Sequence, residues 1–99
     1  MIGGFCRMHD YKAIAKKYLS SISDALRAER NLTQENMAEK LRISSRAYGD
    51  LERGKYCFSS TALLFMMNMM EDEEVGMLLD GFQEQVELLE NQDDDRTSR

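Results

Sequence analysis

In this 99-residue chain, the side chains best suited to bind a ligand lie between residues 42 and 55. The stretch holds Arg42, Arg46, Arg53 and Lys55, whose N–H groups can donate hydrogen bonds to phosphates or to base edges. An arginine offers two donors that match the O6 and N7 acceptors of guanine. Basic residues on a helix surface are more often only solvated, so the residue types alone do not separate a solvated face from a polyanion-binding face.

The sequence contains no arrangement that is typical of catalysis. His9 is the only histidine and has no paired nucleophile, no Gly-rich phosphate loop follows a strand, and the carboxylates are spread over predicted helix faces. Cys6 and Cys57 have no metal-ligand spacing with His9, so we expect two reduced thiols, with a disulfide as the minor alternative. We therefore expect no enzyme, no metal and no cofactor.

The basic residues are held by two short predicted helices on either side of a sharp turn. Thr33 can cap a first helix at residues 34–41, and Ser44 can cap a second helix after a turn at residues 42–44. The apolar side chains fall on one face of each helix, with Ile43 at the corner: Met37, Ala38, Leu41, Ala47, Tyr48 and Leu51. Residues 33–54 thus predict a helix-turn-helix.

This motif and its flanks resemble the phage-repressor (XRE/Cro-like) family of helix-turn-helix DNA-binding domains over about residues 22–70. The resemblance rests on four blocks at the family's spacing, which are residues 26–34, residues 37–44, residues 51–55 and the pattern Leu63, Met66, Met67, Met70. It implies an all-α fold, a compact five-helix bundle of the lambda-repressor-like DNA-binding type. We expect an extended N-terminal helix and a long C-terminal helix around it.

The resemblance also implies roles for individual residues. The second helix of such a motif lies in the major groove, and the positions that face base edges are Ser45, Arg46, Gly49 and Asp50. Gly49 has no side chain to read a base, so sequence specificity is expected to be modest. The positions that would contact phosphates are Gln34, Arg42, Ser44, Arg53 and Lys55. A partly buried salt bridge is expected between Arg27 and Glu52.

Two residues depart from the family pattern at places where a glycine is frequent. Asn31 follows the first helix, and asparagine is the residue that best replaces glycine in the left-handed conformation that closes a helix. Arg42 lies in the turn of the motif, where a left-handed long side chain carries some strain. The first departure supports the predicted helix boundary, and the second weakens the fit slightly.

Charge is divided unevenly along the chain. Residues 1–58 hold 11 Lys and Arg and 7 Asp and Glu, which gives +4, whereas residues 59–99 hold 2 and 11, which gives −9 and a total of −5. The basic half contains the motif, so the acidic balance does not exclude DNA binding. It does predict weak non-specific affinity.

The rest of the chain is organised around the motif. We expect a flexible leader at residues 1–9, a helix-turn-helix domain at residues 10–70, an amphipathic packing or dimerisation helix at residues 71–91 and a disordered acidic tail at residues 92–99. Asp10 can cap the first helix, whose lysines at positions 12, 16 and 17 lie opposite its apolar stripe. These lysines could approach DNA backbone, although a solvated helix face is the commoner reason for such a pattern.

The fourth helix is apolar almost all the way round, and a long amphipathic helix follows it. The short link at residues 71–72 predicts that the last helix folds back onto the fourth helix, and the apolar stripe is longer than that helix can cover. We expect the excess to form a two-fold dimer or partner surface of Phe65, Val75, Leu79, Phe82, Val86 and Leu89. The alternative is a last helix that packs only on its own domain.

Two functions of different classes follow. The first is a sequence-specific DNA-binding transcriptional regulator, by family default a repressor, that occupies an operator in double-stranded DNA as a homodimer. The alternative is a protein-interaction or antitoxin-like helical module whose acidic C-terminal half binds a protein partner. The longest apolar run, residues 62–67, is too short to span a bilayer, and no secretion signal is recognisable, so we expect a cytoplasmic protein without membrane contact.

Overall fold

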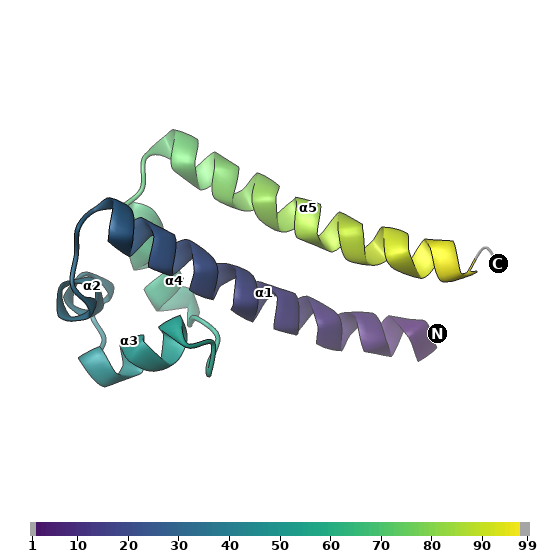
Figure 1. The fold of residues 1–99 in the computed structure, drawn as a ribbon, viewed down its shortest axis with the longest axis horizontal. Helices are drawn as coiled ribbons and strands as arrows, with labels where there is room; N and C mark the ends of the chain where they lie inside the picture. The colour runs from purple at the N-terminus through teal and green to yellow at the C-terminus, as the bar shows by residue number, and fades with distance from the viewer. Residues whose placement is uncertain (1, 98–99) are drawn as a thin grey trace.

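The computed structural model describes the backbone of residues 2–97 and the side chains of residues 11–91. Five α-helices build this part of the chain (Figure 1): α1 (Ile2–Glu29), α2 (Gln34–Leu41), α3 (Ser45–Glu52), α4 (Ser60–Asn68) and α5 (Asp72–Thr97). The short helices α2, α3 and α4 gather near the C-terminal end of α1, while α5 runs alongside α1 in the opposite direction. The all-α, five-helix prediction is confirmed.

The start of each short helix is fixed by a hydroxyl group, as the sequence predicts for Thr33 and Ser44. The hydroxyl of Thr33 accepts a hydrogen bond from the Asn36 N–H at 3.0 Å, and the Asn36 side chain accepts one from the Thr33 N–H in return. Ser44 accepts from the Ala47 N–H at 3.0 Å at the start of α3. Ser59 does the same at the start of α4. These bonds satisfy N–H groups that a helix terminus leaves without a partner.

Both predicted left-handed positions are observed. Asn31 has φ 57° after α1, and Arg42 has φ 63° after α2, where its N–H closes the helix on the carbonyls of Ala38 and Glu39. Gly54 adopts φ 77° after α3, a conformation that costs a glycine little. At Arg42 the same conformation is strained, because the residue has a side chain. Its guanidinium packs against Phe65, 4.6 Å from the centre of the ring.

The core of the domain lies between α1, α2, α3 and α4. The most deeply buried large side chains are Tyr48, Met37, Leu41 and Met66. They belong to a continuous apolar cluster with Leu26, Ala38, Leu51, Phe58 and Ala62. Tyr48 brings a polar group into this cluster, and its hydroxyl lies 2.8 Å from the hydroxyl of the fully buried Ser23. Burial of such groups is tolerated because they are hydrogen-bonded.

Two helix boundaries differ from the expected ones. The first helix begins at Ile2 and not at Asp10, so residues 2–9, expected as a flexible leader, continue α1. No proline interrupts this segment, and a residue able to cap a helix does not force the helix to start there. The last helix continues past Asn91 to Thr97 and so includes most of the expected disordered tail, while residues 98 and 99 lie outside the described residues.

The partner of α5 also differs from the expectation, because α5 packs mainly on α1 and runs alongside it (Figure 1). The rings of Tyr18 and Phe82 lie 6.0 Å apart, and the Tyr18 hydroxyl donates to the Leu78 carbonyl at 2.7 Å. Arg30, at the end of α1, forms an ion pair with Glu74 at 2.7 Å. The described contacts come from residues 11–30 of α1, and they already bury part of the stripe of α5 within one subunit, so the stripe does not by itself require a second subunit.

Phe65, another member of the expected dimer surface, has contacts within its own subunit. Its ring is only half-buried but packs against the core cluster, and the Arg42 guanidinium covers it. Of the other members of that surface, Leu79 is 60 % exposed, whereas Val75, Phe82, Val86 and Leu89 are half-buried.

Within the described part of the chain, no helix is both long and apolar enough to cross a bilayer.

Two glycines of α5 test the packing of α5 on α1. A methyl group at Gly81 would collide with the Tyr18 hydroxyl, whereas one at Gly76 would meet nothing within 4 Å. We expect Gly76→Ala to stabilise the protein by about 1 kcal/mol, because alanine is the better helix former. Gly81→Ala should lower the melting temperature, because the Tyr18 ring must move and its bond to Leu78 is lost. Thermal unfolding of both variants is the measurement, and equal stabilisation by the two would contradict the observed register.

Candidate nucleic-acid interface

The N-terminal end of α3 presents polar side chains to solvent. Ser45 and Arg46 are exposed, and neither side chain has a hydrogen bond or an ion pair with another described residue. The opposite side of α3 is anchored in the core by Tyr48 and Leu51. The free donors therefore sit on a helix whose position is fixed, which is the arrangement needed to read the edges of bases in the major groove.

The outer face of α3 continues from Arg46 through Gly49 and Asp50 to Arg53, because residues three and four apart share a helix face. Gly49 is buried, although it was expected at the reading surface. The Nη1 atom of Arg53 lies 3.5 Å from the position that a Cβ of Gly49 would occupy, and the same guanidinium forms an ion pair with Asp50. A Cβ at Gly49 would make only an ordinary contact with this guanidinium, so Arg53 lies over α3 beside Gly49 without requiring a glycine there.

This arrangement changes the roles expected for two residues. Asp50 is nearly covered, with 14 % of its side chain exposed, and its carboxylate is engaged by Arg53. It is therefore not free to accept a hydrogen bond from a cytosine amino group as the structure stands. Arg53 keeps 69 % of its side chain exposed, so the cation itself remains open to a partner. The open donors of the outer face are those of Ser45, Arg46 and Arg53.

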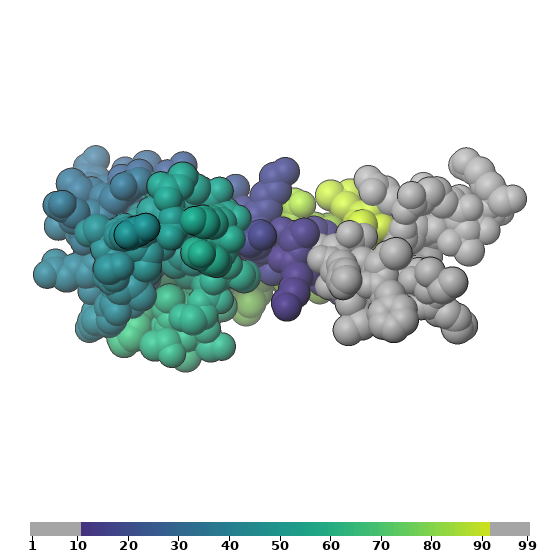
Figure 2. All heavy atoms as spheres, turned by 90° about the horizontal axis from the view of Figure 1, so that it is seen from below, coloured from purple at the N-terminus to yellow at the C-terminus, as the bar shows by residue number. Residues whose placement is uncertain are grey.

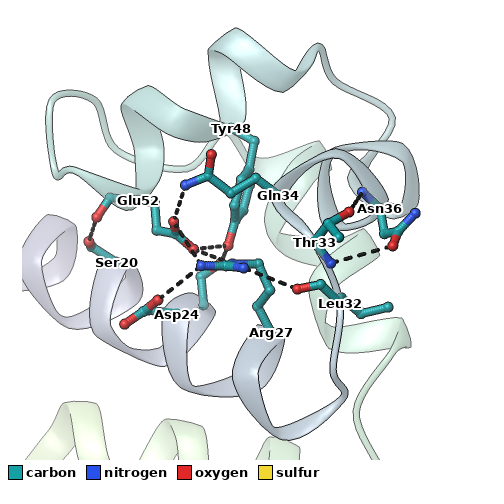
Figure 3. A network of polar contacts seen from close by, with 10 residues as sticks. Ser20, Asp24, Arg27, Leu32, Thr33, Gln34, Asn36, Tyr48 and Glu52 are labelled. Atoms are coloured by element: carbon teal, nitrogen blue, oxygen red, sulfur yellow. Dashed lines mark hydrogen bonds and ion pairs between the residues drawn. The ribbon is translucent and has the colours of Figure 1, made fainter.

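Glu52 fastens the C-terminal end of α3 to α1 through a network of hydrogen bonds (Figure 3). Its carboxylate accepts from Arg27 Nε at 2.7 Å, from the Tyr48 hydroxyl at 2.8 Å and from the Gln34 amide at 2.7 Å. Only 10 % of the Glu52 side chain and 23 % of the Arg27 side chain are exposed. The salt bridge that the family resemblance implied between Arg27 and Glu52 is present, and it lies at the junction of α1, α2 and α3.

The network determines the protonation of its members. Burial raises the pKa of Tyr48 to about 12, so the phenol stays protonated and can donate to Glu52. Burial also acts to raise the pKa of Glu52, but the hydrogen bonds from Arg27, Tyr48 and Gln34 outweigh it, and this pKa is lowered overall. The bond to Glu52 raises the pKa of Arg27 in turn. Glu52 is thus held as a carboxylate.

The expected phosphate-contacting residues differ in what holds them. Ser44 caps α3, and Gln34 donates to Glu52 while remaining exposed at the start of α2. Arg42 is turned onto Phe65 and donates to the Lys40 carbonyl at 2.8 Å. Lys55 is exposed, with its ammonium 5.6 Å from the centre of the Tyr56 ring. Gln34, Arg42, Arg53 and Lys55 are all exposed and keep N–H donors that a phosphate could reach.

Sequence reasoning missed two hydroxyl groups that attach α3 to α1. The Ser23 hydroxyl meets that of Tyr48, and the Ser20 hydroxyl donates to the Glu52 carbonyl at 2.7 Å. A serine at position 23, four residues before Arg27 and among apolar neighbours, is the signal that could have indicated the first contact. Among the residues whose side chains the structure describes, no group of three His, Cys, Asp or Glu residues could hold a metal ion.

Because Glu52 is held as a carboxylate, the free energy of unfolding should depend on pH. A carboxylate with a lowered pKa in the folded state stabilises the fold fully above its ordinary value of about 4.3, and this stabilisation is lost as the pH falls through the folded-state pKa. Glu52→Gln should therefore cost about 2–3 kcal/mol at neutral pH, the usual worth of hydrogen bonds to a charged group. Its stability curve should approach that of the wild type in acid.

Urea unfolding between pH 2.5 and pH 7 measures this effect. Glu39→Gln is the matched control, because Glu39 is an exposed carboxylate whose side chain has no ion pair with another described residue. The control should follow the wild-type curve at every pH. A Glu52→Gln variant that loses stability in acid as steeply as the wild type would contradict the assignment of the acid sensitivity to Glu52.

Comparison with known proteins agrees with the geometry. A family model described as helix-turn-helix, of the XRE/Cro-like type, matches residues 24–69, which run from the end of α1 to the end of α4 and contain the whole interface. No match was found among the curated proteins or the solved structures with which the chain was compared. By this match and by its fold, the central domain of the chain is a member of the XRE/Cro-like helix-turn-helix family.

Proposed function

We propose that the protein is a transcriptional repressor that recognises an operator sequence in double-stranded DNA and binds it as a homodimer. The family is one of DNA-binding regulators. The observation that carries the proposal is the division of α3 into two sides, one fixed in the core and one with exposed, unpaired donors at Ser45 and Arg46. Such a helix can enter the major groove without rearrangement.

In this proposal, one cation recognises a base and other side chains position the domain on the phosphates. Arg46 has its whole fork of donors free and can pair with the O6 and N7 atoms of one guanine. Arg53, Lys55 and Gln34 lie around the ends of α2 and α3, where they support contacts to phosphates that orient the domain. Because only one arginine of α3 is free to read bases, we expect few base pairs to be specified in each half-site.

The dimer is proposed through one flank of α5. Val75, Leu79 and Val86 are four and seven residues apart, so they lie on the same side of the helix, and Leu79 is the most exposed of them. Phe82 and Leu89 lie closer to α1, and Phe82 contacts Tyr18. A two-fold axis along this flank would give two recognition helices, as a palindromic operator of two half-sites requires.

The alternative function, a module that binds a protein partner, is supported by the solvent-facing side of α5. This side carries exposed carboxylates and exposed apolar groups: Asp72, Glu73, Met77, Asp80, Glu84, Glu87 and Leu88. A basic amphipathic partner would complement such a surface. The binding of this protein to DNA in the absence of any other protein separates the two functions.

The roles of the two arginines can be tested by substitution. Arg46→Ala should lose about 1–3 kcal/mol of binding to an operator selected from a random pool, and it should relax the preference at one base pair. Arg53→Ala should weaken the binding of all duplexes alike and reduce the salt slope by about 0.9. Fluorescence anisotropy at several salt concentrations gives both quantities. If the two variants behave identically, the assigned roles are wrong.

The dimer flank can be tested with two matched leucines. Leu79 and Leu88 are 60 % and 58 % exposed, and because they are nine residues apart they lie on opposite sides of α5. Leu79→Asp should convert the dimer to a monomer and weaken operator binding, whereas Leu88→Asp should change neither. Sedimentation equilibrium and operator titration are the measurements. A dimer that survives Leu79→Asp, or that dissociates only in Leu88→Asp, would contradict the proposed flank.

A further inference from the structure

The middle of α1 and the segment after α3 together line a depression on the protein surface. Lys12 and Lys16 of α1 form one wall, and Lys55, Tyr56 and Cys57 form the other. Ala13 and Ala15 of α1 also line the depression. This part of α1 precedes residues 24–69, so it lies outside the matched helix-turn-helix region.

A second depression continues the first along α1. Lys16 lines both, and the second adds Lys17 and Ser20 from α1 and Arg53 and Gly54 from the end of α3. We call the two together the basic groove, whose cations are Lys12, Lys16, Lys17, Arg53 and Lys55. It connects α1 with the end of the proposed reading helix.

The charges of the basic groove are not neutralised locally. Among residues 11–91, no Asp or Glu lines either depression, and none forms an ion pair with Lys12, Lys16, Lys17 or Lys55. Arg53 is paired with Asp50 and still keeps 69 % of its side chain exposed. A chain with a net charge of −5 that collects five cations in one continuous groove has a surface suited to a polyanion.

The outer side of α3 and the basic groove lie on the same face of the molecule, so one ligand can contact both. Figure 2 shows the teal segment at the end of α3 and the purple start of the described part of α1 next to each other on the same face. A rigid duplex that meets α3 can therefore reach the basic groove without a bend in the protein. Lys12 and Lys16 lie about one helical turn apart, roughly 6 Å along the axis of α1, so both can face a strand that carries a phosphate about every 3.4 Å along the duplex axis.

We propose that the basic groove binds the sugar–phosphate backbone of the same duplex that α3 reads, beside the reading site. Lys12 and Lys16 then act as phosphate contacts contributed by α1, outside the helix-turn-helix motif. The inference rests on the proposed function, because it takes the operator as the ligand. It adds that the bound site extends beyond the base pairs under α3 and that the long first helix takes part in binding.

A pair of charge-neutralising variants tests the groove. Lys12→Gln combined with Lys16→Gln should reduce the slope of log K against log salt by about 1.8, since each lost phosphate contact contributes about 0.9. Between 50 and 200 mM salt, the ratio of wild-type to variant affinity should then shrink about tenfold. Lys40→Gln, at an exposed lysine of α2 outside the groove, is the control and should keep the wild-type slope.

The length of the duplex provides a second measurement that needs only the wild-type protein. Base pairs added beside the recognised sequence should tighten wild-type binding and have no effect on the double variant. Circular dichroism checks that the variants fold. If the wild type binds its operator but gains nothing from the added base pairs, or if the double variant keeps the wild-type salt slope, the groove is not a phosphate site. If the wild type binds no duplex, the proposed function itself fails.

Discussion

The rest of the structure depends on the ionised carboxylate of Glu52. A charge that is 10 % exposed is tolerable only when it is fully paired, and Glu52 receives donors from α1, α2 and α3 at once. Because these donors come from three elements, the carboxylate can be satisfied only when the three helices have their native arrangement. The network therefore fixes the orientation of α3 more strictly than apolar packing does, since apolar contacts are non-directional.

A fixed orientation is what a short reading helix needs. With eight residues, α3 is too short to be stable alone, and its geometry comes from Tyr48 in the core and Glu52 at its end. Both residues lie on the inner side, so the outer side is left free for residues that do not serve the fold. Gly49 belongs to this outer side: its missing side chain weakens the helix by about 1 kcal/mol relative to alanine, and the Arg53 guanidinium lies beside it.

The sequence was sufficient where a structure is determined by local chemistry. The hydroxyl caps at Thr33 and Ser44, the left-handed positions of Asn31 and Arg42 and the core face of the motif were all predicted, because each depends on residues within four positions of one another. The partner of α5 could not be predicted in this way. Its stripe fits any apolar neighbour, and the choice of α1 depends on pairs far apart in the sequence, Tyr18 with Phe82 and Arg30 with Glu74, which no local pattern reveals.

The arrangement of the two long helices also explains how an acidic protein can present a basic DNA-binding face. Tyr11 and Tyr18 turn one side of α1 toward α5, where they meet Glu90 and Leu78, while Lys12 and Lys16 lie on another side with Lys55. Thus α1, about 10–12 Å across with its side chains, stands between the carboxylates of α5 and the basic groove. The carboxylates of α5 are thus held about a helix diameter away from a duplex bound at the groove, and salt in the surrounding solvent, with a Debye length of about 8 Å at physiological ionic strength, weakens their repulsion of the phosphates. The net charge of the chain then describes its solubility better than its affinity for DNA.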